Sequence, residues 1–260
     1  MFSKSKLELI YIANSGVCVQ FKDKKVMIDG VHVKTPNPYY STHEKTVEKM
    51  LLNKEPFHNI DLMLYTHHHT DHFDASATNE ILKRNKHIQL VAPETVLTML
   101  SGAPNYNPLL ASQIRAVSIP INKSMQMNLH DIPFEIFHLK HDGETYQGVE
   151  NYAYLFEIKN KVFLHVGDAQ TSVSNFESTT IYDKHVDVLI VPFPFIGLSA
   201  GRKIIKQINP QRVIVTHLPN KKFDKMNWLH NTMKVYKKYH EDIPSTEFLT
   251  RPGQIIEFNR

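Results

Sequence analysis

The chain has 260 residues, of which 42% are hydrophobic and 22% are charged, and its formal net charge is +4. This composition is ordinary for a soluble globular protein, and the length allows a well-buried core. No run approaches the ~18 apolar residues of a transmembrane helix, and no dense stripe of lysine and arginine indicates a nucleic-acid-binding module.

The first half of the chain predicts strands that alternate with helices. The expected strands cover residues 7–13, 16–21, 25–29, 60–65 and 88–92, and the expected helices cover 43–52, 76–85 and 93–100. The segment 30–42 contains two prolines and is predicted to be irregular. Whether residues 31–45 cover a functional site or pack away from it is left open.

The second half begins with strands again. We expect an antiparallel set at 114–119, 134–141, 151–158 and 161–168, then strands at 186–193, 212–217 and 253–258, with helices at 199–208 and 223–240. In the last helix, Met226, Leu229, Met233 and Tyr236 share one face. Both halves run strands and then a helix, which is typical of two β-layers enclosed by helices. We therefore expect an α/β (α+β) fold with residues 1–260 in a single domain.

The single cysteine and the first 16 residues indicate the cellular compartment in which the protein is expected. Cys18 is the only cysteine, which excludes an intramolecular disulfide and a thiolate zinc site. Residues 1–16 do not resemble a signal peptide, because Glu8 interrupts the apolar run and no small-residue cleavage site follows. We expect a cytoplasmic protein.

The stretch THHHTDHFD, residues 66–74, is the strongest chemical signal, because histidine and aspartate are common metal ligands. Alternate residues of an extended loop point the same way, so His67 and His69 can bind one ion together. Asp71 and His72 follow the turn and can bind a second ion. We expect His68 to be a spacer that faces away.

Three further candidate ligands also follow strands, where a rigid scaffold holds functional loops. His141 would complete the first site, His217 would complete the second, and Asp168 would bridge the two ions. His138 is an alternative to His141, but it lies in mid-strand, whereas His141 precedes a loop. His165 lies inside a strand, where core packing is the expected role.

These motifs together resemble the metallo-β-lactamase superfamily. THHHTDH is similar to its T-H-x-H-x-D-H signature, HVGDAQ to its G-D-[ST] element and VIVTH to the segment with its final histidine, so that the resemblance spans residues 10–217. It implies a four-layer αβ/βα sandwich of two mixed β-sheets flanked by helices, with a dinuclear metal site on one edge. KVMIDG resembles the family's first motif and implies that Asp29 orients a ligand imidazole.

Departures from particular subfamilies narrow the resemblance. True zinc β-lactamases usually carry cysteine where Asp168 stands, and flavodiiron proteins carry an acidic residue where His69 stands. The glyoxalase pattern is absent from KHDGETYQG. GDAQ and VDVLIVPFPF look more like the branch that contains ascorbate-6-phosphate lactonase-like proteins and phospholipase-D-like N-acylethanolamine phospholipid hydrolases.

Aromatic residues near the predicted site could form its wall. Tyr39, Tyr40, Phe193 and Phe195 lie on proline-containing loops and are candidates for contact with substrate; covering the sheet edge is the alternative. His32 and His43 could line the cleft, but we expect both to be plain surface histidines.

The predicted function is metal-dependent hydrolysis of an ester, lactone or phosphodiester of a small metabolite. A hydroxide held between two divalent ions would attack, and Asp71 would carry a proton to the leaving group. Ligation by nitrogen and oxygen suits zinc, while manganese, iron or nickel could also occupy such a site. The alternatives are a nuclease or phosphodiesterase acting on nucleic acid or phospholipid, and a non-catalytic metal-binding protein. The expected partners are a small-molecule substrate and other copies of the chain in a homo-oligomer.

Overall fold

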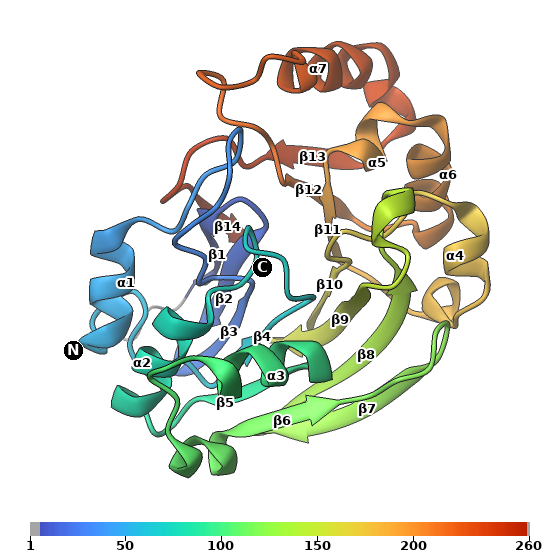
Figure 1. The fold of residues 1–260 in the computed structure, drawn as a ribbon. Helices are drawn as coiled ribbons and strands as arrows, with labels where there is room; N and C mark the ends of the chain where they lie inside the picture. Colours follow the sequence, from blue (N-terminus) through green and yellow to red (C-terminus); the bar gives the residue numbers. More distant parts are fainter. Residues whose placement is uncertain (1–5, 259–260) are drawn as a thin grey trace.

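A computed structural model describes residues 6–258. Two seven-stranded sheets face each other, and helices cover the outer face of each, as Figure 1 shows. This is the four-layer sandwich predicted above. Residues 1–5 and 259–260, which belong to the predicted single domain and, at the N-terminus, to the stretch judged not to be a signal peptide, lie outside the described residues.

The first sheet is built mainly from the N-terminal half. Its strands, in spatial order, are β14 (Ile255–Phe258), β1 (Leu7–Ala13), β2 (Gly16–Phe21), β3 (Lys24–Ile28), β4 (Leu62–Leu64), β5 (Gln89–Pro93) and β6 (Ile114–Val117). Strands β14 to β3 pair antiparallel, and β3 to β6 pair parallel.

The second sheet comes from the C-terminal half. Its strands, in spatial order, are β13 (Ser245–Phe248), β12 (Arg212–Thr216), β11 (Val188–Pro192), β10 (Lys161–His165), β9 (Glu150–Ile158), β8 (Ile132–Lys140) and β7 (Ser124–Leu129). Strands β10 to β13 are parallel, and β7 to β10 are antiparallel. The carboxyl ends of β8, β10 and β12 therefore lie at one edge of this sheet.

Seven α-helices lie in the described part of the chain. They are α1 (Glu44–Leu51), α2 (Ala75–Arg84), α3 (Glu94–Gly102), α4 (Val173–Glu177), α5 (Pro194–Gly197), α6 (Ser199–Ile208) and α7 (Trp228–Tyr239). Short 3₁₀ turns cover Pro108–Gln113, Glu144–Tyr146, Ile181–Asp183 and His240–Asp242. None of the described helices is long and apolar enough to span a membrane.

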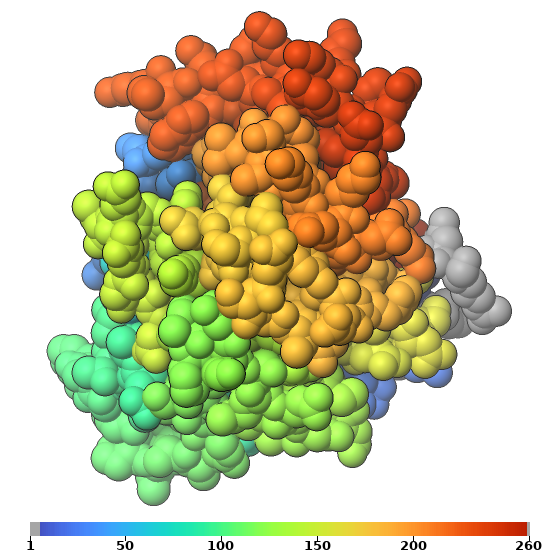
Figure 2. All heavy atoms as spheres, turned by 90° about the vertical axis from the view of Figure 1, so that its right-hand side faces the viewer, coloured from blue at the N-terminus to red at the C-terminus, as the bar shows by residue number. Residues whose placement is uncertain are grey.

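Three buried clusters hold the layers together. The middle one, with Tyr11, Phe134 and Phe163 among its members, fills the space between the two sheets. A second packs helices α1 to α3 on the first sheet, and a third packs α4 to α6 on the second. Figure 2 shows the yellow and orange segment that contains α4 to α6 covering that side of the molecule. The shared middle cluster supports one domain, which stays a prediction.

The prediction for residues 114–119 was wrong. The strand there, β6, pairs in parallel with β5 of the first sheet instead of joining an antiparallel set in the second. The side chain of Gln113, just before β6, donates to the carbonyl oxygens of Asn85 and Ile88 at 2.9 and 3.2 Å, which holds the chain against the first sheet.

Three other differences have simple physical reasons. Strands β7 and β13 are the edges of the second sheet and were missed: β13 has a single apolar residue, Phe248, and the alternating Met125, Met127 and Leu129 of β7 were overlooked. Helix α7 begins at Trp228 rather than at residue 223, and the Asp224 carboxylate accepts the first amide protons of this helix. Leu229 and Tyr236 pack inward, whereas Met226 precedes the helix and Met233 is exposed, so the predicted apolar face is only partly buried.

Candidate metal centre

Seven predicted ligands converge where the two sheets meet. They form three overlapping groups, in each of which the ligand atoms lie within 4.8 Å of one another: His67, His69 and His141; His67, His72 and Asp168; and Asp71, His72 and His217. The chain brings them together because each follows the carboxyl end of a strand, namely β4, β8, β10 or β12.

The loop after β4 is folded by its own backbone. The amides of His72 and Phe73 both donate to the carbonyl oxygen of His69 at 2.9 Å, which turns the chain between the first two ligands and the next two. Asp74 ends the loop as the N-cap of α2, where its carboxylate accepts the Ala77 amide at 2.9 Å. The loop is thus anchored by a strand on one side and a helix on the other.

The first group contains only imidazoles. His67 Nε2 and His141 Nε2 lie 3.3 Å apart, and the His69 ring packs edge-on against both. His141 Nδ1 donates to the carbonyl oxygen of Asp142, which leaves Nε2 as the free acceptor. His138 instead contacts the Ile119 carbonyl oxygen at 2.6 Å and does not belong to this group. The preference for His141 over His138 agrees with this geometry.

The group of Asp71, His72 and His217 combines imidazoles with a carboxylate. Asp71 Oδ2 lies 3.2 Å from His217 Nε2 and 3.7 Å from His72 Nε2. Asp29 Oδ2 accepts His72 Nδ1 at 2.8 Å, so that His72 presents Nε2 to the group. Asp29 therefore lies where the resemblance implied.

Asp168 lies between the all-imidazole group and the group of Asp71, His72 and His217. Its Oδ2 is 3.3 Å from His72 Nε2, 3.2 Å from His217 Nε2 and 3.9 Å from His141 Nε2. Asp168 Oδ1 and His72 Nε2 are both buried without a hydrogen bond to any described group. Buried polar atoms are normally paired, so these two atoms fit a site that binds metal. The ligand roles themselves stay a prediction.

The ionised carboxylates of Asp71 and Asp168 stabilise positive charge on the groups around them. Burial alone would raise the pKa of Asp71 and of Asp168, but the imidazoles of His72 and His217 outweigh burial and hold both values low. Burial would lower the pKa of His72 and His217, but the carboxylates, with Asp168 foremost, raise each to about 10. In the metal-free chain these two imidazoles hold the protons that a cation would replace.

The all-imidazole group behaves in the opposite way. Burial and neighbouring imidazoles lower the pKa of His67 well below its ordinary value and that of His69 to about 4. Both side chains are therefore neutral at physiological pH, which is the form in which imidazole binds metal.

Three residues that position this centre were missed in the sequence. Asn14 donates to the carbonyl oxygen and to Oδ2 of Asp71 at 2.9 and 3.2 Å, while Asn151 Oδ1 accepts the Asp168 amide at 2.9 Å. Thr66 donates to Asp29 through both its amide and its hydroxyl. Asn14 looked like turn material and Asn151 like a strand residue, so only Thr66, inside the motif, carried a usable signal.

A cavity of ≈ 690 Å³ opens onto the centre. Tyr39 and Phe193 line it as predicted, whereas Tyr40 does not and Phe195 is buried in the outer core. His68 lines the cavity instead of facing away, so that prediction was wrong. The backbone turns at His69, where the carbonyl oxygen accepts the amides of His72 and Phe73, so the loop is not extended as the prediction assumed. Residues 36 and 39 are part of the lining, which places the segment 31–45 beside the cavity.

Aromatic rings that sequence reasoning missed complete the wall. Tyr146 packs edge-on against His69 with ring centroids 4.7 Å apart, and Trp228 stacks on Phe193 at 5.7 Å. Tyr39 packs edge-on against His217 at 4.2 Å. Each end of the ligand cluster is therefore flanked by a tyrosine.

The remaining histidines take structural roles. His32 is fully buried and contacts the Ala13 carbonyl oxygen at 3.1 Å and Thr35 Oγ1 at 2.7 Å, so the prediction of a surface residue was wrong. His43 is an exposed N-cap of α1, as expected of a surface residue. His165 is buried and contacts the Ser15 carbonyl oxygen at 3.0 Å, in agreement with a core role.

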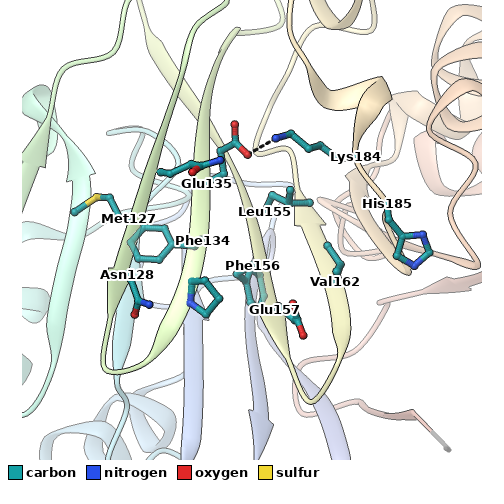
Figure 3. Close-up of a pocket in the computed structure, with 12 residues that line it drawn as sticks. Met127, Asn128, Phe134, Glu135, Leu155, Phe156, Glu157, Val162, Lys184 and His185 are labelled. Carbon is teal, nitrogen blue, oxygen red and sulfur yellow. Dashed lines mark hydrogen bonds and ion pairs between the residues drawn. The ribbon is translucent and has the colours of Figure 1, made fainter.

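A second cavity, also of ≈ 690 Å³, lies along β8, β9 and β10 beside Lys184 and His185. Figure 3 shows Glu135 directed at Lys184, with which it pairs at 2.6 Å. None of the seven ligands lines this cavity. It is a hollow on the sheet and not part of the metal centre.

Replacing Asp29 with asparagine should weaken metal binding by roughly 10- to 100-fold, the usual effect of losing a carboxylate behind a ligand imidazole. Asparagine tolerates the left-handed backbone of this position, where φ is 49°, so the fold should persist. Asp29 now accepts hydrogen bonds from Thr66 and from His72 Nδ1. The side-chain NH2 group of asparagine cannot accept, so we expect the bond that orients His72 to be lost. Retention of metal against a graded chelator measures the effect. Asp187→Asn, a buried aspartate away from the centre, is the control, and equal retention in the two variants would contradict the role of Asp29.

Comparison with known proteins agrees with this architecture. The model of the beta-lactamase superfamily domain matches residues 37–218, whereas curated proteins gave no significant sequence match. Igni18, a metallo hydrolase from Ignicoccus hospitalis, is similar with a TM-score of 0.64 and 15% identity over 98% of this chain and 99% of that chain. The metallo-beta-lactamase fold protein YhfI from Bacillus subtilis has a TM-score of 0.62 and 15% identity over 98% of this chain and 100% of its own.

A third similar structure contains iron. CmlA, a diiron β-hydroxylase from Streptomyces venezuelae, has a TM-score of 0.60 and 14% identity, and the match covers 99% of this chain and 55% of that one. At these identities the structures show a shared fold, while the family model covers most of the chain. The chain belongs to the metallo-β-lactamase superfamily of metal-dependent hydrolases.

Proposed function

We propose that the protein hydrolyses a carboxylic ester or lactone of a small molecule with an uncharged apolar or aromatic group, using two divalent ions. The observation that carries this proposal is the lining of the cavity. Tyrosine, phenylalanine, tryptophan, methionine and proline side chains surround the ligand cluster, and no lysine or arginine in the described part of the chain lines it. A pocket built for a phosphate group would be expected to supply such cations.

The side chains that would hold the ions are those of the three groups above. His67, His69 and His141 would hold one ion, Asp71, His72 and His217 would hold the other, and Asp168 would be shared. Divalent ions bound at such a site act as Lewis acids and lower the pKa of water, which is the chemistry that hydrolysis needs. Zinc suits these ligands best, and iron is the main alternative.

The chain's own residues supply proton transfer and binding. Asp71 lines the cavity and is half-buried, so its carboxylate can accept a proton from the attacking water and pass it to the leaving group. The aromatic walls exclude water and bind the apolar part of the substrate. The electrophilic carbon would lie between Tyr39 and Tyr146, which flank the two ends of the ligand cluster.

The same cavity weighs against the alternatives. A nuclease or phosphodiesterase acting on nucleic acid would need lysine or arginine side chains along the polyanion, and none of the described residues that line the cavity is a lysine or an arginine. A non-catalytic metal-binding protein would not need a cavity beside a full set of ligands. A cytoplasmic location, a single domain and a homo-oligomer stay predictions.

A matched substrate series tests the proposal. Zinc-loaded protein would be assayed with p-nitrophenyl butyrate, an alkyl-substituted lactone and bis(p-nitrophenyl) phosphate. We expect kcat/KM for the ester or lactone to exceed that for the phosphodiester at least tenfold. Faster turnover of the phosphodiester would contradict the proposed substrate class, and no turnover of any of them by the fully loaded protein would favour the non-catalytic alternative.

Trp228→Ala should raise KM for an apolar ester about tenfold with little change in kcat, because an aromatic contact contributes roughly 1–1.5 kcal/mol to binding. Trp228 stacks on Phe193 in the cavity wall and belongs to none of the three ligand groups. Its proposed role is therefore to bind the apolar part of the substrate. Phe223→Ala is the control, since this aromatic residue precedes the same helix but does not line the cavity. Equal KM values in the two variants would show that the Trp228 wall does not bind substrate.

A further inference from the structure

A second cluster of metal-binding side chains lies at the opposite edge of the sandwich. Asp61 comes just before β4, His87 comes just before β5, and His130 lies in the turn between β7 and β8. These positions are the amino ends of β4, β5 and β8, whereas the metal centre lies at carboxyl ends. The cluster therefore shares no residue with the centre described above.

The ligand atoms of the three side chains lie within 4.8 Å of one another. His87 Nε2 is 2.9 Å from Asp61 Oδ1, and the rings of His87 and His130 have centroids 4.3 Å apart. Two imidazoles and one carboxylate are a donor set that zinc accepts, with water in the fourth position.

Hydrogen bonds hold the far sides of two of these groups. Asp61 Oδ2 accepts the Lys25 amide at 2.7 Å, so that Oδ1 is turned to His87. His130 Nε2 donates to the His87 carbonyl oxygen at 2.9 Å, so Nδ1 is the ring nitrogen that carries a lone pair for metal. Such contacts behind the ligands are what orients carboxylates and imidazoles in metal sites.

The turn that carries His130 is tight. Leu129 and Ile132 pair across it, and the two residues between them, His130 and Asp131, have φ values of 52° and 58°. Two consecutive left-handed residues form a hairpin turn with little freedom. Lys24 pairs with Asp131 at 3.8 Å and donates to the His130 carbonyl oxygen, so its charge is paired beside the cluster.

We propose that Asp61, His87 and His130 bind one divalent cation of the zinc type, separate from the ions of the catalytic centre. Asp61 and His87 belong to the first sheet, and His130 belongs to a hairpin of the second. The bound ion would therefore fasten the two sheets together at the edge opposite the cavity and stabilise the β7–β8 hairpin. This inference does not depend on the proposed substrate or on hydrolysis.

The test counts zinc ions in three forms of the whole chain. Zinc would be added in excess, weakly bound metal removed by gel filtration, and the ions per chain measured by elemental analysis. The variants are His87→Ala and His130→Asn; asparagine is chosen because it suits the left-handed turn. His43→Ala, which removes an exposed histidine elsewhere, is the control.

We expect each of the two variants to hold one zinc fewer than the wild type and the His43→Ala control. The wild type should also gain thermal stability when zinc is added to protein whose catalytic centre is already filled, and His130→Asn should not. The test compares the number of zinc ions per chain between variant and wild type, so the expected difference of one is the same whether the catalytic centre binds one ion or two. Equal counts in all forms, or a loss in only one of the two variants, would overturn the proposal and leave an Asp61–His87 ion pair with a stacked imidazole.

Discussion

Asp168→Ala should remove both hydrolysis and stable metal binding. Asp168 is the carboxylate between the two groups, with Oδ2 within 3.3 Å of both His72 Nε2 and His217 Nε2. Without it, the buried imidazoles lose the main source of the charge that raises their pKa, and two cations would face each other without a shared anion. Loss of several kcal/mol of charge stabilisation in the transition state corresponds to a fall in kcat/KM of roughly a thousandfold.

The measurement pairs ions per chain with turnover of the best substrate of the series above. His69→Ala should show the same joint loss, because it removes a ligand of the all-imidazole group. Asp142→Ala is the matched control: this aspartate lines the same cavity but belongs to none of the three ligand groups. Retained metal and full turnover in both Asp168→Ala and His69→Ala would refute the assigned centre.

Gly167→Ala should destabilise the fold by roughly 2–3 kcal/mol and also weaken metal binding. Gly167 has φ of 58°, and a Cβ built there would lie 2.4 Å from Asn151 Oδ1 and 2.8 Å from Thr66 Cβ. Both neighbours hold the centre, since Asn151 accepts the Asp168 amide and Thr66 donates to Asp29. Relieving the clash would displace Asn151 or Thr66 and thereby disturb the hydrogen bonds to Asp168 and Asp29.

Gly253→Ala separates the cost of the positive φ from the cost of the clash at Cβ. Gly253 also has a positive φ, 86°, but a Cβ there meets nothing within 4 Å. Its replacement should cost only the backbone strain, about 1–2 kcal/mol, and leave metal binding unchanged. Urea unfolding and chelator competition on both variants provide the comparison. If Gly167→Ala were as stable and as well loaded as Gly253→Ala, the close packing behind Asp168 would not matter.

Local patterns were sufficient for most of the elements. Helix α6 begins and ends where it was predicted, and the buried strands β4, β10 and β11 were found because continuous apolar runs mark strands covered on both faces. Edge strand β13 was missed because its sequence STEF is mostly polar and resembles a loop, whereas the alternating SMQMNL of β7 did carry a strand pattern that was overlooked. The sheet to which β6 belongs could not be predicted, because strand pairing depends on contacts between distant segments.

The amino-acid sequence was enough to predict which seven side chains come together as candidate metal ligands, because metal binding restricts residue type and spacing within THHHTDH and at strand ends. It was also enough to place Asp29 behind them. Only the tertiary structure decided which other residues meet there. Asn14, Asn151, Tyr146 and Trp228 are common residue types in unremarkable local patterns, and they become part of the site solely because the two sheets bring their loops to one edge. The same packing buried Phe195 and His32, and brought Asp61, His87 and His130 together from segments up to 70 residues apart, since burial and proximity depend on the whole fold and not on local spacing.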